Sequence, residues 1–96
     1  MEILVTYDVA TVDDGGARRL RRVAQVCTNY GQRVQQSVFE CSVSKAQYEQ
    51  MVDDLLQEID NDKDSIRLYR LSMSAAEAVE TYGVDESIDF NDPLIL

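Results

Sequence analysis

The sequence predicts a single small α+β domain whose elements follow the order β-α-β-β-α-β. Three observations predict it: an apolar run of strand length at the start of the chain, two segments with helical spacing of apolar residues, and a β-rich segment between them. The chain has 96 residues, of which 45% are apolar. This length and composition fit one folded domain over residues 1–96 rather than a disordered chain.

The first strand is predicted over residues 1–9. Ile3, Val5 and Tyr7 would face one side of a sheet and Leu4 the other. A strand with apolar residues on both faces is typical of the centre of a sheet.

The first helix is predicted over residues 17–30, after a polar loop at residues 13–16 whose side chains could cap it. Its apolar residues have helical spacing and form one stripe. The stripe consists of Leu20, Val23, Ala24, Cys27 and Tyr30. Gly31 is a favourable residue for ending the helix.

Four arginines of this helix lie opposite or beside the apolar stripe, so we expect their guanidinium groups to face outward together. They are Arg18, Arg19, Arg21 and Arg22.

Residues 32–43 are β-rich and leave two arrangements open. One is a short hairpin that turns near Gln36 and Ser37, and the other is a single kinked strand. Only the hairpin gives the domain four core strands.

A second helix and a fourth strand follow. Ser44 and Gln47 form a capping-box pattern, a polar turn at residues 60–64 ends the helix, and residues 65–71 form the strand. The apolar residues of the helix are Tyr48, Met51, Val52, Leu55, Leu56 and Ile59. The resulting order is the split βαβ arrangement of ferredoxin-like domains.

The end of the chain predicts contacts beyond this core. Residues 75–82 fit a short helix ended by Gly83, and residues 88–96 carry apolar side chains to the last position. An apolar tail is expected to dock on another surface. Because a domain of this size buries only about two-thirds of its unfolded surface, we expect a homodimer.

Charge is unevenly distributed along the chain. The formal net charge is −9, with +1 in residues 1–48 and −10 in residues 49–96. The acidic total argues against nucleic-acid binding, but the local field decides where a polyanion docks. A nucleic-acid contact is therefore expected in the first half only.

Asp8 is the sharpest candidate for chemistry because it ends a strand, where open sheets often border clefts. A carboxylate there could bind Mg²⁺, a hard cation that prefers oxygen ligands, and a two-fold dimer could bring two such carboxylates together. The alternative is that the Asp8 side chain caps the loop that follows it.

The arginines of the first helix form the one dense basic cluster, and Arg33 could extend it. Guanidinium groups bind phosphates in a fork geometry, so the cluster predicts phosphate contacts. The alternative is a solvated helix face paired with the acidic second half. Ser37 is not interpreted as a nucleophile because the chain has no histidine.

Cys27 and Cys41 are expected to be buried thiols, since no CxxC motif or histidine accompanies them. No signal segment or membrane span is visible, so a cytoplasmic protein is expected.

Short motifs in this order resemble the CRISPR-associated protein two family. They are Tyr7-Asp8, residues 18–24, Tyr30-Gly31, residues 33–35, residues 37–41, Tyr82-Gly83 and residues 93–95. The block at residues 39–41 and the ending at residues 93–95 are most similar to members that accompany type I-C systems.

The resemblance implies a ferredoxin-like homodimer with an extra C-terminal strand, here about residues 88–96, that pairs outside its own core sheet. It implies that Asp8 is a Mg²⁺ ligand for endonuclease cleavage of RNA or double-stranded DNA. It also implies a scaffold role, in which the dimer bridges two CRISPR integrase dimers and holds spacer DNA.

One departure from the expected family pattern is the lack of Lys and Arg in residues 72–89, which weakens any DNA contact there.

Two other functions remain open. One is a toxin-like metal-dependent endoribonuclease on the same fold, and the other is a small-molecule regulatory domain. The second has no Gly-rich effector loop to support it.

Overall fold

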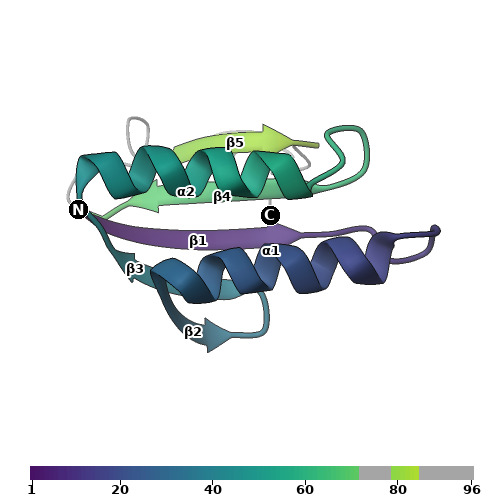
Figure 1. The fold of residues 1–96 in the computed structure, drawn as a ribbon, viewed down its shortest axis with the longest axis horizontal. Coiled ribbons are helices and arrows are strands. Elements are labelled where there is room, and N and C mark those ends of the chain that lie inside the picture. The colour runs from purple at the N-terminus through teal and green to yellow at the C-terminus, as the bar shows by residue number, and fades with distance from the viewer. Residues whose placement is uncertain (72–78, 85–96) are drawn as a thin grey trace, which may run out of the picture.

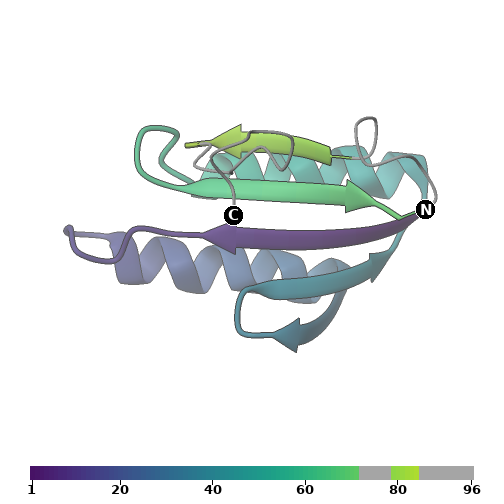
Figure 2. The same cartoon turned by 180° about the vertical axis from the view of Figure 1, so that it is seen from behind.

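The structure is a computed structural model that describes residues 1–71 and 79–84. The elements are β1 (Glu2–Asp8), α1 (Gly16–Tyr30), β2 (Gly31–Gln35), β3 (Val38–Ser42), α2 (Lys45–Glu58), β4 (Ser65–Arg70) and β5 (Val79–Gly83). The strands form one antiparallel sheet in the order β2-β3-β1-β4-β5. Both helices lie on the same face of this sheet (Figure 1), and the view from behind shows the strands in front of them (Figure 2). The predicted α+β class and β-α-β-β-α-β order are confirmed.

The central strand is β1, which pairs with β3 on one side and β4 on the other. Ile3, Val5 and Tyr7 are buried beneath the helices, as the alternation in the sequence predicts. The helix-facing residues of the sheet and the inner faces of both helices make one core. It contains Ile3, Val5, Tyr7, Val9, Val23, Cys27, Phe39, Cys41, Val43, Tyr48, Met51, Leu55, Ile66 and Leu68. In the described part of the chain, no helix has the length and apolar character needed to cross a membrane.

The β-rich segment is a hairpin, which settles the alternative left open by the sequence. β2 and β3 pair in antiparallel register, with an irregularity between Arg33 and Gln35, and turn at Gln36 and Ser37. Tyr7 anchors this turn to the central strand. Its backbone N–H donates to the Ser37 carbonyl at 3.1 Å, and its hydroxyl donates to the Gln36 carbonyl at 3.2 Å.

The first turn of α1 differs from the prediction. Its N-cap is Gly15, with φ +91°, and no side chain caps the helix. The Asp13 carboxylate binds Arg19 and Lys63 instead. The helix does end before Gly31, but this glycine is extended and begins β2 directly. A side chain there would overlap the carbonyl of Glu40, so close packing against β3 explains the glycine.

The start of α2 is the predicted capping box. The Ser44 hydroxyl accepts from the Gln47 backbone N–H at 3.1 Å, and the Gln47 side-chain oxygen accepts from the Ser44 N–H at 2.8 Å. Both bonds satisfy helix-terminal donors that would otherwise lack partners.

The prediction of two buried thiols is also confirmed, since Cys27 and Cys41 are free and buried. Burial raises the pKa of the Cys27 thiol to about 12. Burial also raises the pKa of the Cys41 thiol, so both thiols stay protonated near neutral pH, which makes them poor nucleophiles.

The predicted helix over residues 75–82 is wrong where the structure describes it. Residues 79–83 form β5, which pairs with β4 along its free edge, with Tyr69 opposite Val79 and Ser65 opposite Gly83. Val79, Thr81 and Tyr82 are good strand formers, and pairing removes an exposed sheet edge. Residues 75–78 and the predicted C-terminal strand at 88–96 lie outside the described residues.

Candidate nucleic-acid site

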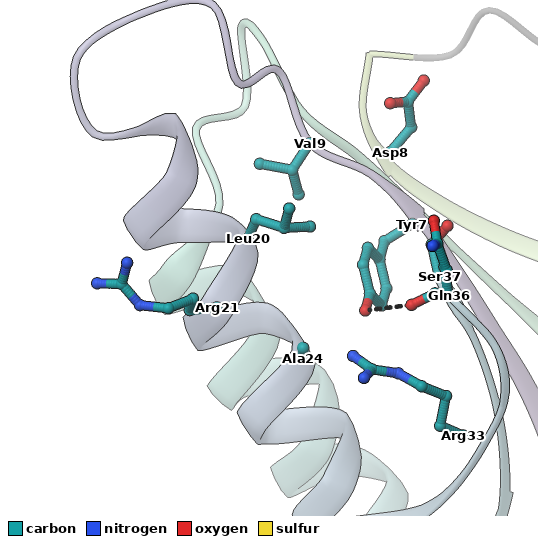
Figure 3. A pocket seen from close by; sticks show the side chains of 9 residues that line it. All are labelled: Tyr7, Asp8, Val9, Leu20, Arg21, Ala24, Arg33, Gln36 and Ser37. Carbon is teal, nitrogen blue, oxygen red and sulfur yellow. Dashed lines mark hydrogen bonds between the residues drawn. The ribbon is translucent and has the colours of Figure 1, made fainter.

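A cleft of about 460 Å³ lies where the end of β1, the middle of α1 and the β2–β3 turn meet (Figure 3). It is called the Asp8 cleft below. Its lining consists of Tyr7, Asp8, Val9, Leu20, Arg21, Ala24, Arg33, Gln36 and Ser37. The fold thus brings together Asp8, Arg21 and Arg33, which the sequence predicts as site residues.

The alternation of β1 sets the position of Asp8. Tyr7 and Val9 turn toward the helices and are buried, so Asp8 turns the other way and is exposed. In Figure 3 its carboxylate points away from Tyr7, at the rim of the cleft. Asp8 also borders a second cleft of about 190 Å³, together with Lys63 and Ser65.

The Asp8 carboxylate makes no hydrogen bond or ion pair with any residue that the structure describes. The alternative interpretation, in which Asp8 caps the following loop, is therefore not supported within the described residues. Nothing there holds this carboxylate in place except its own backbone.

Arg33 and Arg21 line the cleft from different elements, but only the Arg33 guanidinium points into it. Arg33 extends from β2 toward α1, and its guanidinium carbon lies 5.0 Å from the centre of the Phe39 ring, within the range of a cation–π contact. Arg21 is exposed on α1 and points outward at the opposite rim from Asp8. Among the described residues neither has a carboxylate partner.

The expectation that all four helix arginines face outward is wrong for Arg19. Its side chain is only 17% exposed and points into the fold, where Nε donates to the Asp64 carboxylate at 2.8 Å. Nη2 donates to Asp13 at 3.2 Å and to the Ala10 carbonyl at 3.1 Å. The hydrogen bond that Arg19 donates to Asp64 is the main reason that the pKa of Arg19 is raised. Helical spacing sets where a side chain leaves the helix. It does not reveal a partner from a distant segment, here Asp64, toward which the side chain then bends.

Arg18 and Arg22 lie outside the lining of the Asp8 cleft. Arg22 is half-exposed and pairs with Glu58 of α2 at 3.6 Å, while Arg18 is exposed. The arginine cluster is therefore divided between the cleft, the fold interior and the open surface. Nucleic-acid contacts by these residues stay a prediction.

Asp64 is the polar residue that sequence reasoning missed. It is completely buried, and its carboxylate accepts from the backbone N–H groups of Ala10 at 3.0 Å and Asp60 at 2.8 Å, besides Arg19. The sequence did hold a signal. Asp64, just before β4, precedes Ile66 and Leu68 by two and four positions, so the period of two places it in line with the buried face of that strand.

We name this cluster, which runs from the buried Asp64 to the surface, the Asp64 junction. It consists of Ala10, Asp13, Arg19, Lys63 and Asp64. Lys63 Nζ lies 2.7 Å from the Asp13 carboxylate and closes the cluster at the surface.

A single chain supplies few metal ligands at the cleft. The described residues contain no group of three or more His, Cys, Asp or Glu side chains that could hold a metal ion. Mg²⁺ usually keeps several waters and takes one or two carboxylates plus substrate phosphates. The exposed, unpaired Asp8 carboxylate fits one such ligand position.

Comparison with known proteins identifies a family for this chain. The family model for CRISPR associated protein Cas2 matches residues 1–79. A protein of Moorella thermoacetica named CRISPR-associated endoribonuclease Cas2 1 is 56% identical over 96 residues, which cover 100% of both chains. A CRISPR-associated endonuclease Cas2 of Halalkalibacterium halodurans is 52% identical over 95 residues, or 99% of both chains.

A solved structure gives the same result. The crystal structure of Streptococcus pyogenes Cas2 at pH 6.5 superposes with a TM-score of 0.68 and 54% identity, and the match covers 73% of this chain and 84% of that chain. Since the family model matches most of the chain and the relatives match it almost end to end, the chain belongs to the Cas2 family of CRISPR-associated proteins.

Proposed function

We propose that the chain acts in CRISPR adaptation, where a homodimer bridges CRISPR integrase dimers and holds spacer DNA. We further propose that it is a Mg²⁺-dependent endonuclease in which Asp8 is the catalytic metal ligand. The names of its relatives, endoribonuclease and endonuclease, support a nuclease activity. The type I-C subtype stays a prediction from the sequence.

The observation that carries the nuclease proposal is that Asp8, Arg21 and Arg33 line one cleft, with the Arg33 guanidinium inside it and Asp8 and Arg21 at its opposite rims. Each belongs to a different element, and none has an oppositely charged partner among the described residues. An unpaired charge can bind a ligand without first giving up an ion pair within the protein. The arrangement therefore suits a phosphodiester, with guanidinium groups for its oxygens and a carboxylate for a cation.

The metal is expected at the exposed side of Asp8. One carboxylate binds Mg²⁺ weakly, and a two-fold dimer could supply a second Asp8. A bound Mg²⁺ would polarise the phosphoryl group and activate a water molecule for attack. Arg21 and Arg33 would hold the nucleic-acid backbone in register, which orients the scissile bond.

The nuclease proposal is tested by Asp8→Asn, which keeps the size of the side chain and removes its charge. Purified wild-type protein should cleave RNA or double-stranded DNA with Mg²⁺ and lose this activity in EDTA. Asp8→Asn should abolish cleavage with an unchanged melting temperature. RNA and DNA are assayed side by side because the relatives' names differ on the substrate.

Asp62→Asn is the matched control, since Asp62 is also exposed and the substitution makes the same chemical change. Its cleavage rate should equal that of the wild type. Cleavage by Asp8→Asn, or cleavage that survives EDTA, would refute the metal role of Asp8.

Binding is tested through its salt dependence. Each phosphate contact contributes about 0.9 to the log–log slope on duplex DNA. Arg21→Ala and Arg33→Ala should each flatten that slope by roughly this amount, whereas Arg19→Ala should leave it unchanged. Unchanged slopes for both cleft variants would exclude the cleft as a phosphate site.

The scaffold role is tested by co-purification with the CRISPR integrase and by light scattering. A dimer that co-purifies with the integrase and spacer DNA supports the proposal. Cleavage of RNA by a protein that does not bind the integrase would instead favour the toxin-like endoribonuclease.

A further inference from the structure

The last hydrogen-bonded pair between β1 and β4 is Asp8 with Ser65. Immediately beyond it, the chain leaves the sheet. After Val9, which packs in the core, the next hydrogen bonds come from the Asp64 junction, where the Ala10 N–H donates to Asp64 Oδ1 at 3.0 Å and the Ala10 carbonyl accepts from Arg19 Nη2 at 3.1 Å. An ion pair thus holds both polar backbone groups of a residue two positions after Asp8.

Asp64 links this point to the rest of the fold. Its carboxylate binds α1 through Arg19 Nε at 2.8 Å and the turn after α2 through the Asp60 N–H at 2.8 Å. Its backbone carbonyl accepts from the Val84 N–H at 2.7 Å, just after β5. The end of β1 is therefore fixed relative to both helices and the sheet edge.

This connection bears on Asp8 for a physical reason. Among the described residues no donor orients the Asp8 carboxylate, so its position follows from its backbone alone. The β1–β4 ladder fixes that backbone on one side of Asp8, and the junction fixes it on the other. Loss of the junction would remove the hydrogen bonds that hold the chain just beyond Asp8 and leave the packing of Val9 to restrain the end of β1.

We infer that Arg19 and Asp64 are positioning residues that hold the Asp8 carboxylate at the rim of its cleft, and that Arg19 does not contact the substrate. This inference rests on the proposed catalytic role of Asp8. A simple gain in stability does not explain the arrangement, because a buried ion pair is often no more stabilising than apolar residues of the same volume. Two charged side chains that bind both polar backbone groups of one residue do fix the orientation of its backbone.

The test uses Arg19→Lys, which keeps the charge but loses the planar fork, and Asp64→Asn, which keeps the shape but loses an acceptor. Asp54→Asn is the matched control, since Asp54 is a hydrogen-bonded carboxylate on α2 that accepts from Tyr30 at 2.7 Å outside both clefts. Folding of each variant is checked by circular dichroism. Arg19→Lys serves as the main variant if Asp64→Asn does not fold.

Two readouts are combined. Amide hydrogen exchange, measured without metal or substrate, should be at least about ten-fold faster at Ala10 in the variants and unchanged at Val5, in the middle of β1. The kcat for cleavage should fall roughly 10- to 100-fold with KM and the salt slope of binding unchanged. Asp54→Asn should match the wild type in both.

Several results would overturn the inference. Unchanged Ala10 exchange in both variants would do so whether or not cleavage is detected. An unchanged kcat in a folded variant with fast Ala10 exchange would show that the clamp does not control Asp8. A flattened salt slope for Arg19→Lys would mean that Arg19 binds phosphate directly. Cleavage by Asp8→Asn in the same assay would instead refute the proposed function.

Discussion

Ala10 of the Asp64 junction follows Asp8 of the cleft by two positions along the chain, yet the two regions use charge in opposite ways. In the junction, Asp64 is fully buried and each carboxylate meets a cation at 3.2 Å or less. In the cleft, Asp8 and Arg21 are exposed and have no oppositely charged partner among the described residues. Internal pairing marks charges that hold the fold, and its absence marks charges available to a ligand.

The comparison is sharpest between Arg19 and Arg21. Both belong to one run of arginines on α1 and look equivalent in the sequence. Arg19 is committed to Asp64, whereas Arg21 stays at the cleft rim. Mutating the whole cluster together would therefore mix a structural defect with a binding defect, and only single variants separate the two.

The largest expected effect is that of Asp64→Ala on stability. It removes one partner of a buried ion pair and leaves Arg19 Nε and the Ala10 N–H without their acceptor. We expect the free energy of unfolding to fall by about 3–5 kcal/mol, measured by urea denaturation at neutral pH. Asp54→Ala, which breaks a more exposed hydrogen bond, should cost about 1 kcal/mol. Equal losses in the two variants would contradict the structural role of the junction.

The next effect concerns the two glycines with positive φ. Gly83 has φ +85°, and a Cβ there would overlap the carbonyl oxygen of Asp64. Gly83→Ala should therefore cost about 3 kcal/mol, from backbone strain and the clash together. Gly15 has φ +91°, but its Cβ would meet only Arg19 Nη1 at 3.6 Å, so Gly15→Ala should cost about 1 kcal/mol. Thermal denaturation of both variants checks the order, and a greater loss for Gly15→Ala would contradict it.

The parts of the structure that the sequence predicts correctly depend on local patterns. The two helices, the first strand and the capping box at Ser44 follow from residue spacing within one segment. The placement of Asp8 at the end of a strand follows in the same way, and the resemblance supplied its proposed chemistry.

The missed features depend on partners that are distant in the sequence. Residues 79–83 form a strand because β4 offers a free edge, and nothing within the segment shows that. Arg19 turns inward because Asp64, 45 positions later, is placed beside it. The spacing of charges on one helix cannot reveal such a pair before the fold is known.

A smaller effect is expected for Asp8→Asn on stability. An exposed carboxylate without a hydrogen bond contributes little to folding, so the free energy of unfolding should change by no more than about 0.5 kcal/mol. Urea denaturation of this variant beside Asp64→Asn compares the same chemical change in the two regions. A loss above about 1 kcal/mol for Asp8→Asn would show that Asp8 has a structural partner after all.

The smallest expected effect is the pH dependence of the surface contact that closes the junction. The hydrogen bond from Lys63 is the main cause that lowers the pKa of Asp13 below 3.8. The folded state thus holds the ionised form more strongly than the unfolded chain does. The resulting stabilisation is complete above pH 3.8 and is lost as the pH falls through the lower, folded-state pKa. Because Asp13 and Lys63 lie at the surface, salt should weaken the effect.

This stabilisation is measured by comparing the urea midpoints of the wild type and Asp13→Asn at neutral pH and at about pH 3. The two midpoints should approach one another in acid, and a difference that stays constant would mean that Asp13 contributes through packing rather than charge.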